Sequence, residues 1–235
     1  MSHLSLSVQQ RASLLEQCAA LDTASLSDAL DSLGIDAGLQ GIGQQVPGTR
    51  CSGFAFTVLY EPVNQNDGFK NAANYIDDVP PGSVVVSSNA GRLDATVWGD
   101  ILTHVALSRN IRGTVIDGAA RDIDTVTRLG YPLFSRGRFM QSGKNRVQLK
   151  ATQVPVQIGA VTVNPGDLIV GDASGCLVIP IDKALEVIKR AQSVEKTERD
   201  IIESVAQGLS LAEARRLHRY DQPWLAAEAK NPSAA

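Results

Sequence analysis

The sequence has few cysteines, few aromatic residues and no long apolar run, and each shortage excludes a class of protein. Its three cysteines, Cys18, Cys51 and Cys176, are odd in number and far apart, so neither a disulfide framework nor a zinc knuckle is expected. This cysteine usage is typical of a reducing cytoplasm, where we expect the protein to reside. Aromatic residues make up 5% of the chain, so the core has to be built from Val, Ile, Leu and Ala.

Membrane and nucleic-acid partners are not expected either. No run of 18 apolar residues could cross a bilayer, and the N-terminus lacks the basic and apolar segments of a secretory signal. The formal net charge is −3, whereas phosphate binding needs a concentrated positive surface. The densest basic group, within residues 136–150, is interrupted by polar and apolar residues and indicates a solvated face.

The central part of the chain alternates between strand and helix patterns. Runs of β-branched residues over 83–87 and 113–116 predict buried strands. Apolar residues at helical spacing predict helices over residues 95–108 and 121–129, and another short strand follows at 131–134. This alternation is typical of an α/β fold.

Further elements are expected on both sides of this central part. They are helices over residues 8–22 and 25–33, a strand over 54–60, a short helix over 71–76, four short strands within 154–179, and helices over 182–207 and 209–219. The chain is long enough to bury a core without disulfides. We therefore predict one domain over residues 1–181, with residues 182–235 as a helical extension of the same domain. The many charged residues of the helix over 182–207 indicate either a solvated face or a subunit interface.

Two loops of the α/β pattern are candidates for the functional site. In an open α/β layer, ligands collect beyond the carboxyl ends of the strands, next to helix N-termini. The loops at residues 89–99 and 117–122 each follow a predicted strand and lead into a predicted helix. The sequence therefore predicts that the site lies where these two loops meet.

The second loop ends in an arginine and an aspartate at the start of a helix. The guanidinium of Arg121 can bind a carboxylate through two parallel hydrogen bonds. Asp122 offers hard oxygen ligands suited to Mg²⁺ or Mn²⁺. Taken alone, the two residues could equally be a helix cap and a surface ion pair.

The first loop ends in Gly99 and Asp100, inside a helical pattern. A glycine inside a helix costs about 1 kcal/mol relative to alanine. This cost indicates that the helix begins near Gly99 and leaves backbone N–H groups that can hold an anion. Close helix packing at Gly99 beside a solvated Asp100 would explain the same residues.

The two segments together form a more specific pattern, in which twenty residues separate Asp100 from Arg121 and Asp122 follows directly. This pattern resembles the family of 4-hydroxy-4-methyl-2-oxoglutarate/4-carboxy-4-hydroxy-2-oxoadipate aldolases, which includes the ribonuclease regulator RraA. The resemblance covers roughly residues 22–182. It extends to the segments Ser27–Leu30, Pro81–Val86, Val115–Gly118, Pro165–Asp167 and Gly171–Gly175.

The resemblance implies a fold, an assembly and a metal. The fold would be a layered β/β/α domain with C-terminal helices, assembled as a homotrimer or homohexamer. Asp122 would hold Mg²⁺ or Mn²⁺, largely through water molecules. An acidic residue from the C-terminal helix of a neighbouring subunit would complete the site, and Glu195 or Glu198 is the candidate here.

The resemblance also implies how the substrate is held. The backbone amides of Gly99, Asp100, Ile101 and Leu102 would bind its carboxylate. Arg121 would contact its pyruvyl part, and Asp100 would position a water that takes part in proton transfer.

The implied activity is divalent-metal-dependent (class II) cleavage of a 4-hydroxy-2-oxo acid such as 4-hydroxy-4-methyl-2-oxoglutarate, with oxaloacetate decarboxylase activity. Both reactions leave a pyruvate enolate, which a metal and Arg121 would stabilise. A Schiff-base lysine is not expected, because Lys70, Lys144 and Lys150 lie outside the two loops. The alternative is a non-catalytic RraA-type regulator that binds a ribonuclease. The presence of both Arg121 and Asp122 favours the enzyme.

Other residues near the two loops have two interpretations each. His104, one turn after Asp100, could complete a two-ligand metal site but is interpreted as a helix-surface histidine. Arg92 and Asp94 either contact the distal half of the substrate, together with the loop at 64–66, or cap the following helix.

Overall fold

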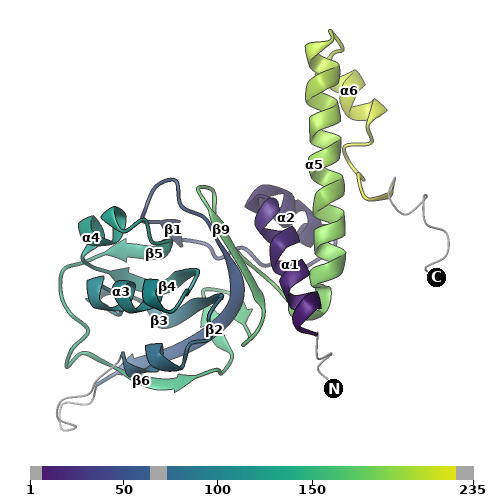
Figure 1. The fold of residues 1–235 in the computed structure, drawn as a ribbon. Coiled ribbons are helices and arrows are strands. Elements are labelled where there is room, and N and C mark those ends of the chain that lie inside the picture. Colours follow the sequence, from purple (N-terminus) through teal and green to yellow (C-terminus); the bar gives the residue numbers. More distant parts are fainter. Residues whose placement is uncertain (1–6, 64–72, 226–235) are drawn as a thin grey trace. The chain divides into compact units, whose positions relative to one another are not determined.

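The computed structural model describes residues 7–63 and 73–225 and contains two compact units, which we call the sheet unit and the helical unit (Figure 1). The sheet unit comprises Ala37–Ile181, and the helical unit combines Met1–Asp36 with Asp182–Ala235. The mixed α/β fold expected from the sequence is confirmed. Residues 1–36 thus group with the C-terminal helices, although the sequence suggested a division at residue 181 alone.

In its described residues, 7–36 and 182–225, the helical unit contains four α-helices. They are α1 (Val8–Ala20), α2 (Thr23–Asp31), α5 (Ala184–Ala206) and α6 (Leu211–Leu217), and a short 3₁₀-helix, η2 (Ile181–Lys183), leads into α5. The Asp22 carboxylate caps α2 by accepting a hydrogen bond of 2.7 Å from the Ser25 backbone N–H. The Arg190 guanidinium of α5 donates to the carbonyl and hydroxyl oxygens of Ser32 after α2. The contact between Arg190 and Ser32 joins segments that lie 158 residues apart in the sequence.

The sheet unit is built on one large mixed sheet. Its strands are β1 (Gly43–Gln44), β2 (Cys51–Pro62), β3 (Ser83–Thr96), β4 (Gly113–Ala120), β5 (Leu133–Arg138), β6 (Val147–Thr152), β9 (Leu168–Asp172) and β10 (Gly175–Ile179). They follow the order β1-β5-β4-β3-β2-β9-β10, and β6 pairs with β2. Strands β2 to β5 are parallel, and the other pairs are antiparallel. A separate hairpin contains β7 (Val156–Ile158) and β8 (Val161–Val163).

Two α-helices and a 3₁₀-helix complete the sheet unit. These are η1 (Asn74–Asp78), α3 (Asp100–Ser108) and α4 (Ile123–Arg128). The helices pack over the parallel strands, because Leu102 and Ala106 of α3 and Val126 of α4 share a buried cluster with Val85 and Ile116 of the sheet. Burial on both faces explains why the central strands are continuous β-branched runs.

The predicted helix at 95–108 begins later than expected, because β3 continues to Thr96 and α3 starts at Asp100. The positive φ angles of Ala90 and Gly91 create an irregularity, after which pairing with β4 resumes at Arg92. The start of the helix near Gly99, indicated by the cost of a helical glycine, is confirmed. The predicted helix at 121–129 is likewise shortened to α4, because Asp122, with a left-handed backbone, precedes its first residue.

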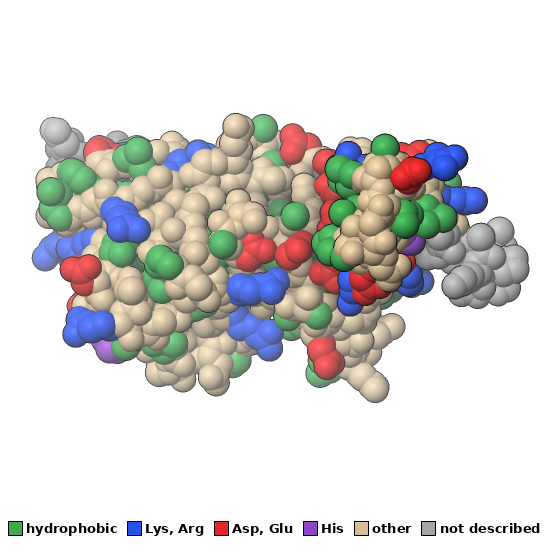
Figure 2. All heavy atoms as spheres, turned by 90° about the horizontal axis from the view of Figure 1, so that it is seen from above, with side chains coloured by type: hydrophobic (Ala, Val, Ile, Leu, Met, Phe, Trp, Pro, Cys, Tyr) green, Lys and Arg blue, Asp and Glu red, His purple; other side chains and the backbone are tan. Residues whose placement is uncertain are grey.

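Two surface properties bear on possible partners: the distribution of charged side chains and the length of the apolar helices. On the face drawn in Figure 2, Lys and Arg side chains are dispersed among acidic ones. None of the helices in residues 7–63 and 73–225 is both long enough and apolar enough to span a bilayer.

Candidate functional site

Most of the predicted loops at 89–99 and 117–122 is strand, because β3 continues to Thr96 and β4 to Ala120. The short segments that follow, residues 97–99 and 121–122, lie side by side at the carboxyl ends of these strands. These strands are parallel neighbours, so both chains leave the sheet at the same edge. The Val97 backbone N–H donates to the Ala119 carbonyl at 3.3 Å, and the Arg121 N–H donates to the Trp98 carbonyl at 3.0 Å. The sheet therefore joins the start of α3 to the start of α4.

Asp122 has an unusual backbone and a side chain that spans the two loops. Its φ of 58° is in the left-handed region, which few residues other than glycine adopt. Its carboxylate oxygen Oδ2 accepts a hydrogen bond of 3.1 Å from the Asp100 N–H and lies 3.4 Å from Arg121 Nε. Both ion-pair partners remain about a third exposed, at 38% for Arg121 and 34% for Asp122. A carboxylate and a guanidinium are thus held together in reach of solvent.

Gly99 allows this close approach because it has no side chain. Its backbone is extended, with φ at −162°, so conformation alone does not require glycine. A Cβ at this position would lie 2.5 Å from Asp122 Oδ2 and 3.3 Å from Arg121 Nε. Position 99 must therefore be glycine if Asp122 and Arg121 are to keep their places.

The N-terminus of α3 attracts carboxylate oxygens, as its free amides predict. The Asp100 N–H donates to Asp122 Oδ2, and the Ile101 N–H donates to Asp100 Oδ1 at 2.7 Å. Two of the four amides expected to bind a substrate carboxylate are thus engaged by carboxylates of the chain itself. A substrate would have to replace these side-chain oxygens in order to use the same donors.

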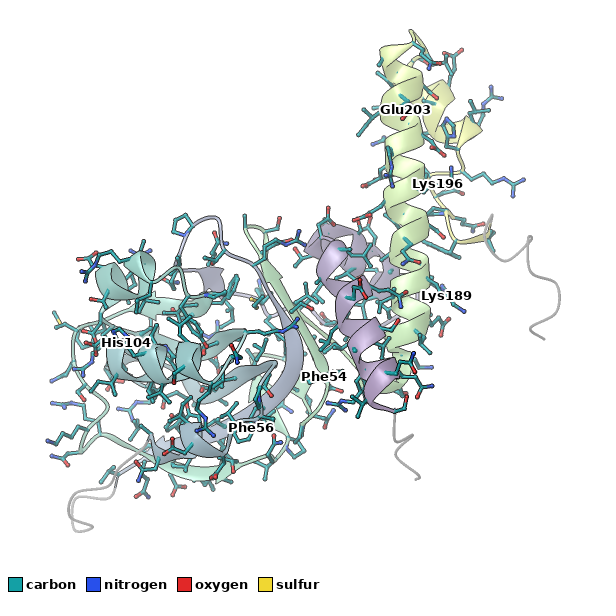
Figure 3. All side chains as sticks on the ribbon, in the orientation of Figure 1. Phe54, Phe56, His104, Lys189, Lys196 and Glu203 are labelled. Carbon is teal, nitrogen blue, oxygen red and sulfur yellow. The ribbon has the colours of Figure 1, made fainter. Side chains whose placement is uncertain are left out.

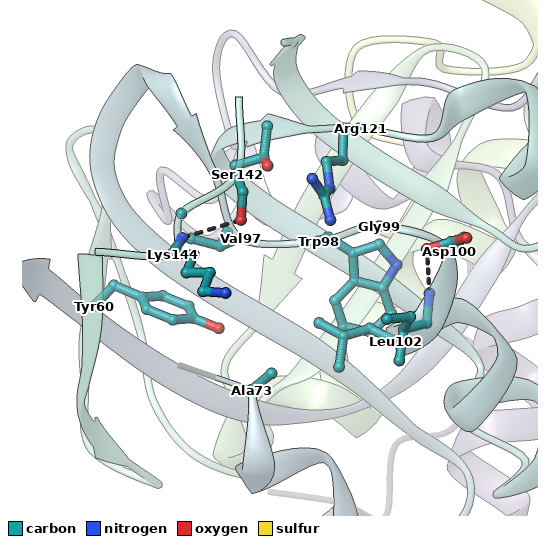
Figure 4. A pocket seen from close by; sticks show the side chains of 13 residues that line it. Tyr60, Ala73, Val97, Trp98, Gly99, Asp100, Leu102, Arg121, Ser142 and Lys144 are labelled. Carbon is teal, nitrogen blue, oxygen red and sulfur yellow. Dashed lines mark hydrogen bonds between the residues drawn. The ribbon is translucent and has the colours of Figure 1, made fainter. Parts of the chain in front are cut away.

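A cleft with a cavity volume of about 210 Å³ opens beside the two loops (Figure 4). Of the six site residues predicted at the two helix starts, five line it: Gly99, Asp100, Ile101, Leu102 and Arg121. Asp122 is not among the lining residues, but its carboxylate is hydrogen-bonded to Asp100 at the cleft wall. The remaining lining residues are Tyr60, Ala73, Thr96, Val97, Trp98, Ser142, Gly143 and Lys144.

Trp98 forms a rigid base for the α3 end of the cleft. Its ring stacks on Tyr131 with centroids 5.8 Å apart, and its Nε1–H donates to the Thr103 hydroxyl at 2.9 Å. The Thr103 hydroxyl in turn donates to the Gly99 carbonyl at 2.9 Å. Side chains of the buried core thus fix the loop that carries the candidate site.

Tyr60 and Lys144 are cleft residues that sequence reasoning missed. Tyr60 comes from β2, and burial raises its pKa well above the ordinary value, so the phenol stays protonated. Lys144 comes from the loop before β6 and was set aside because it lies outside the two predicted loops. No local pattern could have found either residue, because only the tertiary fold brings β2 and this third loop to the cleft.

The other candidate residues lie at different places. His104 is exposed on α3 (Figure 3), and Arg92 forms an ion pair with Asp94 at 2.8 Å instead of capping a helix. Glu195 and Glu198 lie one turn apart on α5 in the helical unit. The segment at 64–66 lies outside the described residues.

A divalent cation at the two loops would have few protein ligands. Within residues 7–63 and 73–225, no three His, Cys, Asp or Glu side chains are grouped so as to hold a metal ion. The acidic side chains next to the two helix starts are those of Asp122 and Asp100, and the Asp122 carboxylate accepts a hydrogen bond from the Asp100 backbone N–H. This donor set suits Mg²⁺, which keeps several waters and is commonly bound by one or two carboxylates.

The chain matches the family model described as RraA-like, Aldolase/RraA, over residues 23–178. It is 45% identical over 221 residues to protein DlpA of Legionella pneumophila, which covers 94% of this chain but 36% of DlpA. The chain therefore spans about a third of the length of that relative. A Halalkalibacterium halodurans protein, provisionally named 4-hydroxy-4-methyl-2-oxoglutarate aldolase, is 32% identical over 150 residues, covering 58% of this chain and 71% of the relative.

The chain is also similar to proteins of known structure. The crystal structure of an uncharacterized protein from Pseudomonas syringae pv. tomato is 64% identical, with a TM-score of 0.81, covering 87% of this chain and 97% of the other. RraAS2 of Streptomyces coelicolor, described as an unusual member of the RNase ES inhibitor RraA protein family, is 29% identical. Its TM-score is 0.74, and the match covers 80% of this chain and 95% of that structure.

Proposed function

Because the chain belongs to the RraA-like (Aldolase/RraA) family, we propose that its cleft is the active site of a divalent-metal-dependent pyruvate aldolase. The substrate would be a 4-hydroxy-2-oxo acid such as 4-hydroxy-4-methyl-2-oxoglutarate, and oxaloacetate would be decarboxylated at the same site. The observation that carries the proposal is the contact between Arg121, Asp122 and the N-terminus of α3 at one edge of the cleft.

The pyruvyl half of the substrate fits the groups at this edge. Arg121 lines the cleft and offers N–H donors for the oxygens of a 2-oxo acid. The amides at the start of α3 provide donors for the C1 carboxylate, and their engagement by Asp100 and Asp122 indicates that they favour carboxylate oxygens. In this proposal the side-chain carboxylates move aside when the substrate binds.

Both reactions break the bond between C3 and C4 and leave the electron pair on C3 of pyruvate. In the aldol cleavage the C4 hydroxyl loses its proton and becomes a carbonyl, whereas oxaloacetate loses carbon dioxide. Arg121 stabilises the negative charge that develops on the C2 oxygen. Asp100 positions the water that returns a proton to C3.

Asp122, with Asp100 beside it, would hold the cation. A divalent cation supplies Lewis-acid stabilisation of the enolate charge. The proposed mechanism needs no lysine nucleophile. The electron pair left on C3 is delocalised onto the C2 oxygen, so no imine has to form.

The deciding experiment measures pyruvate released from oxaloacetate and from 4-hydroxy-4-methyl-2-oxoglutarate, with Mg²⁺ or Mn²⁺ and then with excess chelator. We expect release from both substrates, loss of release with chelator, and recovery when the metal is restored. Release that persists unchanged in chelator would contradict the metal-dependent mechanism. Absence of release from both substrates would contradict the proposed activity.

A regulator that binds a ribonuclease is the second candidate, because the chain is 29% identical to a member of the RNase ES inhibitor family. The two candidates differ in their need for the Arg121–Asp122 pair. A regulator would bind its partner equally well as the wild type and as a variant without the Asp122 carboxylate.

A further inference from the structure

We infer that the helical unit binds a small linear polyamine in a cavity formed by α2, α5 and the segment after α6. The cavity has a volume of about 210 Å³, and all of its lining residues belong to this unit. In Figure 1 the segment after α6 turns back along α5, and Tyr220 and Trp224 of this segment line the cavity. The site is independent of the proposed lyase activity.

The charged groups of this cavity are carboxylates. Four acidic side chains line it, namely Asp28, Asp31, Glu198 and Asp221, and its described lining residues include no Lys or Arg. None of the four forms an ion pair with the part of the chain that the structure describes. The cavity therefore attracts a cation.

Thr197 provides an unused hydrogen-bonding group in the wall of the cavity. This residue is only 9% exposed, and its hydroxyl makes no hydrogen bond to any residue within 7–63 and 73–225. Ser193, one turn earlier, instead donates to the Lys189 carbonyl within α5. A buried hydroxyl without a partner costs free energy, and an ammonium N–H can donate to its oxygen. Thr197 therefore indicates a polar ligand independently of the carboxylates.

Aromatic and apolar side chains suit the carbon chain of an organic cation. Trp224, Tyr220 and Val194 line the cavity. The guanidinium carbon of Arg190 lies 5.6 Å from the centroid of the Trp224 ring, and that of Arg215 lies 4.8 Å from the centroid of Tyr220. Both rings thus already attract a cation, and each ring has a second face. An alkyl chain can pack against these side chains while its ammonium groups face the carboxylates.

A single metal ion does not match this arrangement. Among the described residues, no three His, Cys, Asp or Glu side chains lie close enough together to share one metal ion. The carboxylates are instead distributed over α2, α5 and the segment after α6. A polyamine carries ammonium groups separated by several methylenes, so one molecule can reach carboxylates on different elements.

The carboxylates of the cavity also repel one another. Burial raises the pKa of Asp28, and the charges of Asp31 and Asp22 raise it further. Burial likewise raises the pKa of Glu198, together with the charges of Asp28, Asp22 and Glu195. A bound polyamine would relieve this repulsion.

Titration calorimetry with spermidine at low ionic strength tests the site. We expect saturable binding by the wild type and about 10-fold weaker binding by the double variant Asp28→Asn/Asp31→Asn, whose two carboxylates are exposed. The matched control is Asp36→Asn/Glu203→Gln, which removes the same charge from exposed positions of the unit that do not line the cavity. Glu198 is left unchanged, because it is also a candidate for the site of a neighbouring subunit.

Two further variants locate the bound amine. The chain has two tryptophans, and Trp98 is buried in the sheet unit, whereas Trp224 lines the cavity. We expect spermidine to change the tryptophan fluorescence of the wild type, and Trp224→Leu to remove this change. Thr197→Val should weaken spermidine binding about 5-fold and yet not lower the thermal midpoint, because it removes a hydroxyl that has no partner in the free protein.

Three results would overturn the inference. The first is no saturable binding of spermidine by the wild type, or equal weakening in the two double variants, which would reduce the effect to general charge attraction. The second is binding of Mg²⁺ as tight as that of spermidine, which would indicate a metal site. The third is a fluorescence change that persists in Trp224→Leu, which would place the amine elsewhere. None of these results bears on pyruvate release, so the lyase proposal is tested separately.

Discussion

Gly99 and Asp122 fit against each other because one lacks a side chain and the other has a left-handed backbone. The carboxylate of Asp122 occupies the space that a Cβ on residue 99 would take, at 2.5 Å. This contact also brings Asp122 Oδ2 to the Asp100 amide. The geometry of the candidate site therefore depends on a single absent methyl group.

Replacing Gly99 by alanine tests this dependence. We expect Gly99→Ala to fold, because its extended backbone suits alanine, but to lose activity about 100-fold as Asp122 and Arg121 are displaced. The measurements are pyruvate release and circular dichroism. Gly38→Ala is the control, since a Cβ there meets nothing within 4 Å. Wild-type turnover in Gly99→Ala would show that the close contact is not needed.

The charge of Asp122 is tested best by asparagine. Alanine would be strained at a φ of 58°, whereas asparagine tolerates the left-handed region. We expect Asp122→Asn to lose metal-dependent pyruvate release roughly 100-fold or more while its thermal midpoint stays near that of the wild type. Asp124→Asn, at an exposed position in the first turn of α4, should keep its activity. Retained turnover in Asp122→Asn would contradict the metal assignment.

The guanidinium of Arg121 provides shape as well as charge. We expect Arg121→Lys to lower kcat for oxaloacetate roughly 100-fold, because an ammonium cannot form two parallel hydrogen bonds in the same plane. Steady-state kinetics at saturating metal measures the effect. Equal kcat in the variant would indicate that Arg121 does not contact the substrate.

The site residues predicted from sequence were those next to a strand end or a helix start. Gly99, Asp100 and Arg121 could be predicted because parallel strands bring their carboxyl ends together. Lys144 and Tyr60 could not, because they reach the cleft through contacts with segments far away in the sequence. The catalytic and binding roles assigned to Asp100, Arg121 and Asp122, and to Glu195 and Glu198 of a neighbouring subunit, are predictions.

At the scale of elements, continuous apolar patterns gave reliable strands and helices. The buried runs of β3 and β4 and the stripe of α5 could be recognised from periodicity alone. Strand β6 was not predicted, although Val147–Thr152 alternates between apolar and polar residues; of its residues only Val147 is fully buried. The extension of β3 past Gly91 was also missed, because a turn-like segment lies inside the strand.

Helix α5 carries a carboxylate that is unfavourably placed for stability. Partial burial raises the pKa of Glu198, and the neighbouring charges of Asp28, Asp22 and Glu195 raise it further. A raised pKa in the folded state means that ionised Glu198 destabilises the fold. This destabilisation is present at pH above the folded pKa and is relieved as the pH falls through it.

Glu198→Gln should therefore raise the thermal midpoint at pH 7 by about 1–2 °C, and the gain should disappear as the pH falls towards that of carboxyl titration. Differential scanning calorimetry between pH 4.5 and 7.5 measures this difference. Glu203→Gln, at an exposed position on the same helix, is the control and should change little. A gain that is independent of pH would contradict the electrostatic explanation.

On the scale of the whole molecule, each unit contains a buried thiol. Cys18 lies in the helical unit, and Cys51 and Cys176 lie in the sheet unit. Burial raises the pKa of Cys18 and of Cys51 to about 12, and it raises that of Cys176 as well. The thiols are thus both shielded and protonated at neutral pH.

The native protein should therefore react slowly with a thiol reagent at pH 8, and all three cysteines should react in denaturant. Mass spectrometry of labelled peptides at intermediate denaturant would report which unit opens first, because Cys18 marks one unit and Cys51 the other. Rapid labelling of one cysteine in the native state would contradict the burial of that site.

The division into two units could not be predicted from local patterns. The N-terminal helices were recognised as helices, but their grouping with α5 depends on pairs such as Arg190 and Ser32. Such pairs lie far apart in the sequence, and periodicity contains no information about them. The α/β character was predictable because it follows from the order of neighbouring elements.

The glycine at position 99 also has a genetic consequence. Every single-nucleotide missense change in a glycine codon introduces a residue with a Cβ, which at this position overlaps the Asp122 carboxylate. We therefore expect a single nucleotide change in this codon to alter the site without unfolding the protein.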